Sequence, residues 1–149
     1  MPARLGHAKD YVEAMYLILQ QDTPEDFVIT TGITTPVREF VRLAFRELGI
    51  EVEFKGRGIH EKAFVISCSN SNFHIATGKE VMNVDAKYFR PTEVDLLIDD
   101  PTKCNELLGW KPKYDLKVLV SEMRAADVDL FRKEKLLKKS DYSIKNQFE

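Results

Sequence analysis

The sequence has few cysteines and no long apolar run. Its 149 residues include only two cysteines, Cys68 and Cys104, which lie far apart and without metal-ligand spacing. Two reduced thiols are therefore expected, not a disulfide framework or a zinc site. No apolar run approaches the ~20 residues that cross a bilayer, and Met1–Arg4 lacks the hydrophobic region of a signal peptide. We expect a cytoplasmic protein with no membrane partner.

The sequence also lacks a basic excess and a clustered set of metal ligands. The net charge is −2, which argues against a broad nucleic-acid-binding face. The lysines between Lys133 and Lys139 are explained by the last turn of a helix, where cations suit the helix dipole. The three histidines, at 7, 60 and 74, are not spaced as ligands, so no metal is expected. His7 is predicted to be a hydrogen-bonded structural group.

A glycine-rich dinucleotide loop is missing as well. No Gly-x-x-Gly-x-x-Gly follows a strand pattern, and Gly56-Arg57-Gly58 lacks both the third glycine and the helix that should follow. The same two glycines give the loop around Arg57 the freedom to approach a ligand. Arg57 is therefore a candidate ligand-binding residue, with a solvated loop arginine as the alternative.

What the sequence does contain is an alternation of helix and strand patterns. The pattern predicts a helix over Asp10–Gln21 that buries more than one apolar face. Thr35-Pro36 is typical of a helix start, with the hydroxyl as N-cap and proline in the first position, and Gly49 ends this helix. Strands are predicted at Phe27–Thr30, Glu51–Phe54, Ala63–Ser67, Glu80–Asp85 and Val94–Ile98.

The second half of the chain adds two predicted helices. Asp100-Pro101 marks the start of a helix through Leu108 that Gly109 closes, and a long helix runs from a capping Asp115 to Lys139. Trp110 is predicted to be a core aromatic that locks the first of these helices. Together the patterns predict a single α/β domain over residues 1–149.

Arg90 and Glu93 are the main candidate site residues. Pro91 holds the backbone around Arg90 extended, and Glu93 follows close enough to serve the same ligand. A guanidinium and a carboxylate before a buried strand suit a phosphorylated, hydroxyl-rich ligand. The alternative is a surface salt bridge at a turn, which would contribute under about 1 kcal/mol.

Four segments carry a resemblance to a known family. They resemble the carboxyl-terminal, substrate-binding part of extended short-chain dehydrogenase/reductases, from about Gly6 onward. Arg-Pro-Thr-Glu-Val-Asp at 90–95 is similar to the GDP-mannose 4,6-dehydratase family, whereas most nucleotide-sugar relatives read Arg-Arg-Pro-Gly-Asp. The four segments are Gly6–Val12, Phe89–Asp95, Asp100–Lys103 and Leu108–Pro112.

The resemblance implies a fold and an activity. The fold would be the C-terminal substrate-binding region, with short strands and helices and with the Rossmann half absent. The family enzyme is a lyase that uses NADP to convert GDP-mannose to GDP-4-keto-6-deoxymannose in GDP-fucose biosynthesis. By resemblance, Arg90 would bind the diphosphate, and Glu93 the ribose hydroxyls or the guanine edge. Arg57 is a further candidate for the same ligand.

The chemistry of that family is not expected in this chain alone. The superfamily's Tyr-x-x-x-Lys pair is absent, since Tyr114 and Lys117 stand at the wrong spacing. No catalytic residue is therefore assigned, no NADP is expected to bind this chain alone, and the chain is predicted to be inactive by itself. GDP-mannose or GDP is the expected ligand.

Two alternatives stay open at this point. The chain could be a non-enzymatic nucleotide-sugar-binding or interaction module, or half of another nucleotide-sugar epimerase or dehydratase. In the family the strands Phe27–Thr30 and Val94–Ile98 extend a large parallel sheet, so the isolated chain would expose their edges or faces. Self-association is therefore predicted.

Overall fold

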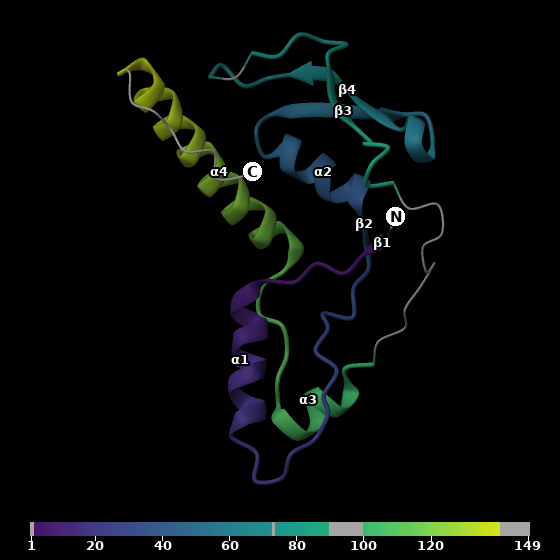
Figure 1. Cartoon of the computed structure of the whole chain (residues 1–149), viewed down its shortest axis with the longest axis vertical. Helices are drawn as coiled ribbons and strands as arrows, with labels where there is room; N and C mark the ends of the chain where they lie inside the picture. Colours follow the sequence, from purple (N-terminus) through teal and green to yellow (C-terminus); the bar gives the residue numbers. More distant parts are fainter. Residues whose placement is uncertain (1, 73, 90–99, 141–149) are drawn as a thin grey trace.

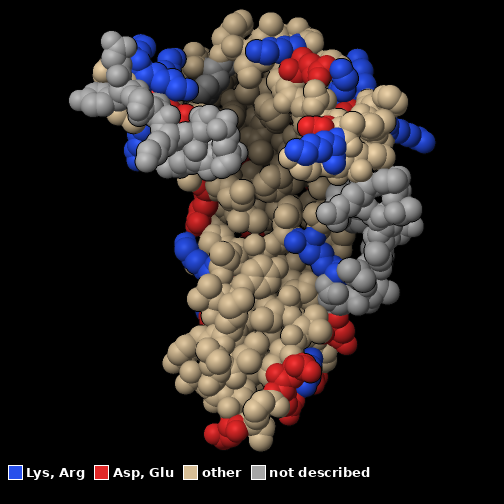
Figure 2. All heavy atoms as spheres, viewed as in Figure 1, with Lys and Arg blue, Asp and Glu red and all other residues tan. Residues whose placement is uncertain are grey.

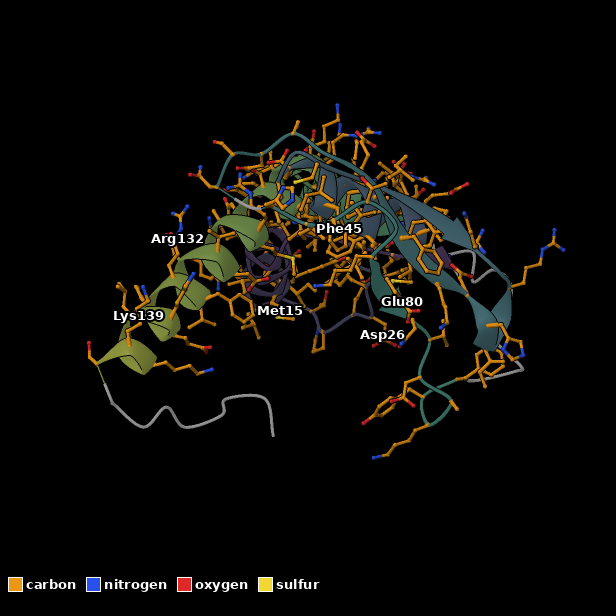
Figure 3. All side chains as sticks on the ribbon, turned by 90° about the horizontal axis from the view of Figure 1, so that it is seen from above. Met15, Asp26, Phe45, Glu80, Arg132 and Lys139 are labelled. Carbon is orange, nitrogen blue, oxygen red and sulfur yellow. The ribbon has the colours of Figure 1, made fainter. Side chains whose placement is uncertain are left out.

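The computed structural model describes residues 2–72, 74–89 and 100–140, which form two lobes with separate apolar cores (Figure 1). The upper lobe contains a three-stranded sheet and α2 (Val37–Arg46), and the lower lobe contains α1 (Ala8–Leu19) and α3 (Thr102–Leu108). The last helix, α4 (Leu116–Lys139), leaves the junction of the lobes and runs past α2. Its far end, which carries Arg132 and Lys139, projects away from the body (Figure 3).

The upper lobe is an antiparallel sheet covered on one face by α2. Alternation of apolar and charged residues directs Ile50 and Val52 inward, and Val65 joins them from the neighbouring strand. Phe45 and Leu48, in and just after α2, pack against this cluster. The strand order is β3-β4-β5, formed by Ile50–Lys55, Lys62–Cys68 and Glu80–Asn83.

The lower lobe is built around Trp110, which is 2% exposed. Ala14 of α1 and Cys104 of α3 are buried against it, and Phe27 and Ile29 pack onto the same cluster. The core of this lobe therefore joins three segments that are distant in sequence. It also confirms the prediction that Trp110 is a core aromatic.

Several predicted elements are confirmed with small shifts of their ends. The strands β3, β4 and β5 match three of the predicted strands. The α4 helix begins after Asp115, whose carboxylate accepts a hydrogen bond from the Val118 N–H at 2.9 Å. At the end of α3, Gly109 has φ +63°, the left-handed conformation that favours glycine at a C-cap. The predicted cap, Asp100, lies one residue before the observed N-cap Pro101, yet its carboxylate still accepts the Thr102 N–H at 2.9 Å.

Two predictions about local structure are wrong. Phe27–Thr30 is not a strand, because no neighbouring strand among the described residues pairs with it; Phe27 and Ile29 pack on the lower core instead. Thr35 is not the N-cap of α2, because Thr35–Pro36 forms the short strand β2, paired antiparallel with β1 (Pro2–Ala3). The cap position falls on Pro36, which has no side-chain donor or acceptor. The predicted strand Val94–Ile98 lies outside the described residues.

The α/β class is confirmed in its coarse form. Helices and strands are both present, but both sheets in the described part of the chain are antiparallel. The prediction that the first helix buries more than one face is wrong for this chain: in α1 only Asp10 and Ala14 are buried. Among the described residues, no helix is long and apolar enough to cross a membrane.

Candidate functional site

The turn that joins β3 to β4 carries Arg57. Gly56 has φ +84°, and a Cβ there would collide with the carbonyl oxygen of His60, so the turn requires glycine. The Arg57 carbonyl accepts the His60 N–H at 3.2 Å, which closes a single 3₁₀ turn, η1, over Gly58–His60. The backbone of the turn is fixed in this way while the Arg57 side chain remains exposed.

Arg57 differs from the cations around it in having no acidic partner in the described ranges. Lys55 pairs with Glu53 at 3.2 Å, and Lys62 pairs with Glu80 at 2.8 Å. For the Arg57 guanidinium, neither an ion pair nor a hydrogen bond is found within residues 2–72, 74–89 and 100–140. Within these residues no acceptor engages the five N–H donors of the guanidinium, so an anion could bind to them.

A bidentate ion pair holds the far side of the same turn. Arg38 of α2 donates to both carboxylate oxygens of Glu61, from Nε at 2.6 Å and from Nη2 at 2.7 Å. The hydrogen bond from Arg38 lowers the pKa of the Glu61 carboxyl below its usual range, and the same contact raises the pKa of Arg38. Because Glu61 directly follows η1, this pair anchors the turn to α2.

The segment that leads to Arg90 comes back to this turn. The ring of Phe89 lies 3.6 Å from the position that a Cβ on Gly58 would occupy. Phe89 and Tyr88 donate their N–H groups to the carbonyl of Asp85 at 3.1 and 3.2 Å, which turns the chain here. The structure thus brings the residue before Arg90 onto the loop of Arg57.

The other two predicted site residues are not placed by the structure. Arg90 and Glu93 lie outside the described residues, so their predicted roles remain predictions. The contact between Phe89 and Gly58 was not foreseen, and neither was the pair of Arg38 with Glu61. No local pattern signals such contacts, because the partners are separated by 31 and 23 residues of sequence.

The first and last of the four resembling segments, Gly6–Val12 and Leu108–Pro112, meet in a buried hydrogen-bond network. The Asp10 carboxylate, on a residue only 1% exposed, accepts the backbone N–H groups of Lys113 at 3.0 Å and Tyr114 at 3.2 Å. The indole Nε1 of Trp110 donates to the Asp10 carbonyl oxygen at 2.9 Å. Asp10 therefore holds the loop between α3 and α4 against the first turn of α1, and its role is structural.

His7 completes this network from the start of α1. Its Nδ1 accepts the Lys9 N–H at 3.2 Å, which makes His7 the N-cap of the helix. Its Nε2 lies 2.9 Å from a carboxylate oxygen of Glu122 in α4, and its ring stacks on Tyr114 with centroids 4.4 Å apart. The hydrogen bond with His7 lowers the pKa of Glu122. The predicted structural role of His7 is confirmed.

The described residues do not fit a dinucleotide cofactor. Gly58 opens a single 3₁₀ turn that leads straight into β4, whereas a pyrophosphate loop needs the N-terminus of an α-helix. We derive no hydride-transfer step for this chain. Within the same residues, no group of three or more His, Cys, Asp or Glu side chains is placed to hold a metal ion.

An apolar pocket of about 280 Å³ lies elsewhere, between α2 and α4. Phe40, Phe45 and Phe131 contribute aromatic side chains, and Arg124 and Asp127 stand among the lining residues. The Arg57 turn does not contribute to it. We therefore treat the turn, with its exposed arginine, as the candidate site.

Comparison with known proteins points to one class, the nucleotide-sugar dehydratases. The model of the family described as GDP-mannose 4,6 dehydratase matches residues 4–123. The GDP-mannose 4,6-dehydratase of Vibrio cholerae serotype O1 is 47% identical over 140 residues, which are 93% of this chain and 38% of the relative. The human GDP-mannose 4,6 dehydratase is 50% identical over 127 residues, 85% of this chain and 32% of the relative.

The chain belongs to the GDP-mannose 4,6-dehydratase family. It spans about a third of the length of the curated relatives it matches. The resemblance on which the sequence analysis depended is thereby confirmed at the level of the family.

Proposed function

We propose that this chain is the substrate-binding portion of a GDP-mannose 4,6-dehydratase and that it binds GDP-mannose through Arg57, Arg90 and Glu93. The complete enzyme would convert GDP-mannose to GDP-4-keto-6-deoxymannose, with NADP held by residues that this chain does not carry. Alone, the chain would bind the nucleotide and leave the sugar unchanged.

The observation that carries the proposal is the contact of Phe89 with the Arg57 loop. It sets the residue before Arg90 against Gly58, the residue after Arg57. A diphosphate would suit guanidinium groups supplied by these two neighbouring segments, because each could make charge-assisted hydrogen bonds to its oxygens. Arg57 supports this role because its side chain is exposed and is unpaired within the described residues, unlike Lys55 and Lys62 beside it.

The two alternative functions differ in the nucleotide that the chain would bind and in whether it would contribute to catalysis. Half of another epimerase or dehydratase would favour UDP or dTDP over GDP. A non-enzymatic nucleotide-sugar-binding module would bind GDP and would not gain activity from the rest of a dehydratase. The family match and the dehydratase relatives favour the GDP reading.

The test is a calorimetric titration of the whole chain with GDP, UDP and NADP. We expect GDP to bind and the other two to bind far more weakly. Arg57→Ala and Arg90→Ala should each raise the dissociation constant for GDP about ten- to hundredfold, the value of one or two charge-assisted hydrogen bonds. Arg57→Lys should recover part of the loss, because it keeps the charge but not the planar fork.

A matched control is Arg132→Ala, which removes an equally long cation from the far part of α4, where its side chain is 62% exposed. This variant should bind GDP as the parent does. Absence of GDP binding by the folded chain, or equal loss in the control, would refute the proposed site. Turnover of GDP-mannose by the chain with added NADP would contradict the prediction that it is inactive alone.

A further inference from the structure

The upper lobe carries many ion pairs, and one of them reaches the Arg57 turn from another element. Figure 2 shows acidic and basic side chains beside one another over this lobe. The pair of Lys55 with Glu53 stays within one strand. The pair of Arg38 with Glu61 instead joins α2 to the residue that follows the turn, through hydrogen bonds of 2.6 and 2.7 Å. Because both bonds run between planar groups, this pair fixes a direction as well as a distance.

The same guanidinium also contacts the strand that enters the turn. The Arg38 Cζ atom lies over the ring of Phe54, 5.9 Å from its centroid, and Phe54 stands in β3 three residues before Arg57. Arg42, one helical turn later on α2, lies over the same ring at 5.5 Å. Only Arg38 of these two also binds Glu61, on the far side of the turn. Arg38 therefore contacts the chain on both sides of the turn, before and after it.

Glu61 extends these contacts to the segment that contains Phe89. Its backbone carbonyl accepts the Val84 N–H at 3.3 Å, and its own N–H donates to the Gly58 carbonyl at 3.2 Å. Val84 begins the segment that turns at Asp85 and sets the Phe89 ring against Gly58. Glu61 thus contacts α2 through its carboxylate, the turn through its N–H and the Phe89 segment through its carbonyl oxygen. A shift of Glu61 would move both candidate segments of the site.

The polar groups of the pair are engaged with each other. Arg38 uses Nε and Nη2 on the two carboxylate oxygens of Glu61, and its Cζ atom lies over Phe54. We propose that Arg38 and Glu61 are positioning residues, which hold the Arg57 turn and the Phe89 segment in the arrangement that binds GDP and do not themselves contact the nucleotide. This inference rests on the proposed function, because it concerns the same site.

The first experiment measures GDP affinity by calorimetry in variants of the whole chain. The Arg38 side chain is 46% exposed, so its replacement opens no buried cavity and the variants should fold. Arg38→Met should raise the dissociation constant about tenfold. Arg38→Lys should raise it less, because it keeps the charge but not the planar fork. The matched control is Arg42→Met: Arg42 lies over the same Phe54 ring but pairs with Glu39 inside α2, at 2.9 Å. The control should bind GDP as the parent does.

Two further variants distinguish positioning from direct binding. If Arg38 acts through Arg57, Arg38→Met should raise the dissociation constant only about threefold or less in a chain that already carries Arg57→Ala. A guanidinium that bound the nucleotide itself would cost the same factor in both chains. Glu61→Gln tests the sign of the effect. Removal of a negative charge near a diphosphate would by itself tighten binding, whereas loss of the positioning pair should weaken binding several-fold.

Amide hydrogen exchange tests the same pair without any nucleotide. The N–H groups of His60 and Glu61 make the hydrogen bonds of the turn, each 3.2 Å long. Their exchange should become several-fold faster in Arg38→Met and stay unchanged in Arg42→Met. If the parent chain did not bind GDP while this exchange difference persisted, the proposed function would fail and the hold of the pair on the turn would still be supported.

Four results would overturn the positioning role. They are equal GDP affinity in Arg38→Met and the parent, equal loss with and without Arg57→Ala, tighter binding in Glu61→Gln, and unchanged amide exchange in Arg38→Met.

Discussion

Replacing Asp10 with asparagine removes the charge at the centre of the junction between α1 and the loop before α4. The carboxylate accepts two backbone N–H groups, from Lys113 and Tyr114. An asparagine side chain has one acceptor oxygen, so its NH₂ group must face the second N–H donor. At a site that is 1% exposed, water cannot replace the lost acceptor.

The expected cost follows from these contacts. Loss of one charge-assisted hydrogen bond costs about 1.5–3 kcal/mol. Loss of the negative charge in the first turn of α1 adds about 0.3–1 kcal/mol. The free energy of unfolding should therefore fall by about 2–4 kcal/mol, a large part of the 5–15 kcal/mol typical of a folded domain.

Urea unfolding followed by tryptophan fluorescence measures this loss at the site itself. Trp110 is the only tryptophan, and it donates to the Asp10 carbonyl at 2.9 Å. Asp10→Asn should lower the urea midpoint by about 1–2 M with little change in slope. Asp129→Asn, on a carboxylate that is 66% exposed, is the control and should change stability by less than about 0.5 kcal/mol. Equal midpoints for the two variants would refute the reasoning.

Three further predictions concern the Arg57 turn and the lower core. Gly56→Ala should destabilise the fold more than Gly78→Ala, because both have φ +84° but only the first Cβ meets a backbone carbonyl; thermal unfolding of the pair tests this. Arg38 lowers the pKa of Glu61, so their pair stabilises the native state above about pH 4.5 and loses this effect as pH falls further. Unfolding at pH 3–6 should show a smaller pH dependence in Arg38→Met, and an unchanged dependence would contradict the assignment. Burial raises the pKa of the Cys104 thiol, so iodoacetamide at pH 8 should alkylate it only at the rate of unfolding; rapid labelling in native buffer would contradict this burial.

Local chemistry predicted the elements that are stabilised by nearby residues. The Asp115 cap, the Gly109 C-cap and the alternation of β3 depend on side chains within a few positions, and the structure contains all three. Phe27–Thr30 has the composition of a strand, but strand formation needs a partner, and the sequence pattern does not specify one.

The candidate site was predictable only in part, for the same reason. The glycines around Arg57 indicated an adaptable loop, and the turn does depend on Gly56. The approach of Phe89 to Gly58 depends on the path of the chain between them, which no short pattern encodes. The first helix was predicted to bury more than one face because its apolar residues lie on more than one side, but Val12, Met15, Tyr16 and Leu19 are exposed; the pattern marks apolar faces and does not identify what covers them.

The junction between Asp10 and Trp110 also has a consequence for biosynthesis. The helix α1 is translated before the groups that complete its buried face, which follow it by 100 residues or more. At about 5–20 residues per second, α1 waits at least several seconds for these partners while the chain is translated. Throughout that interval the face of α1 that packs on Trp110 lacks this cover. This delay makes the nascent α1 helix a target for chaperones, and slower translation between the two segments would lengthen its exposure.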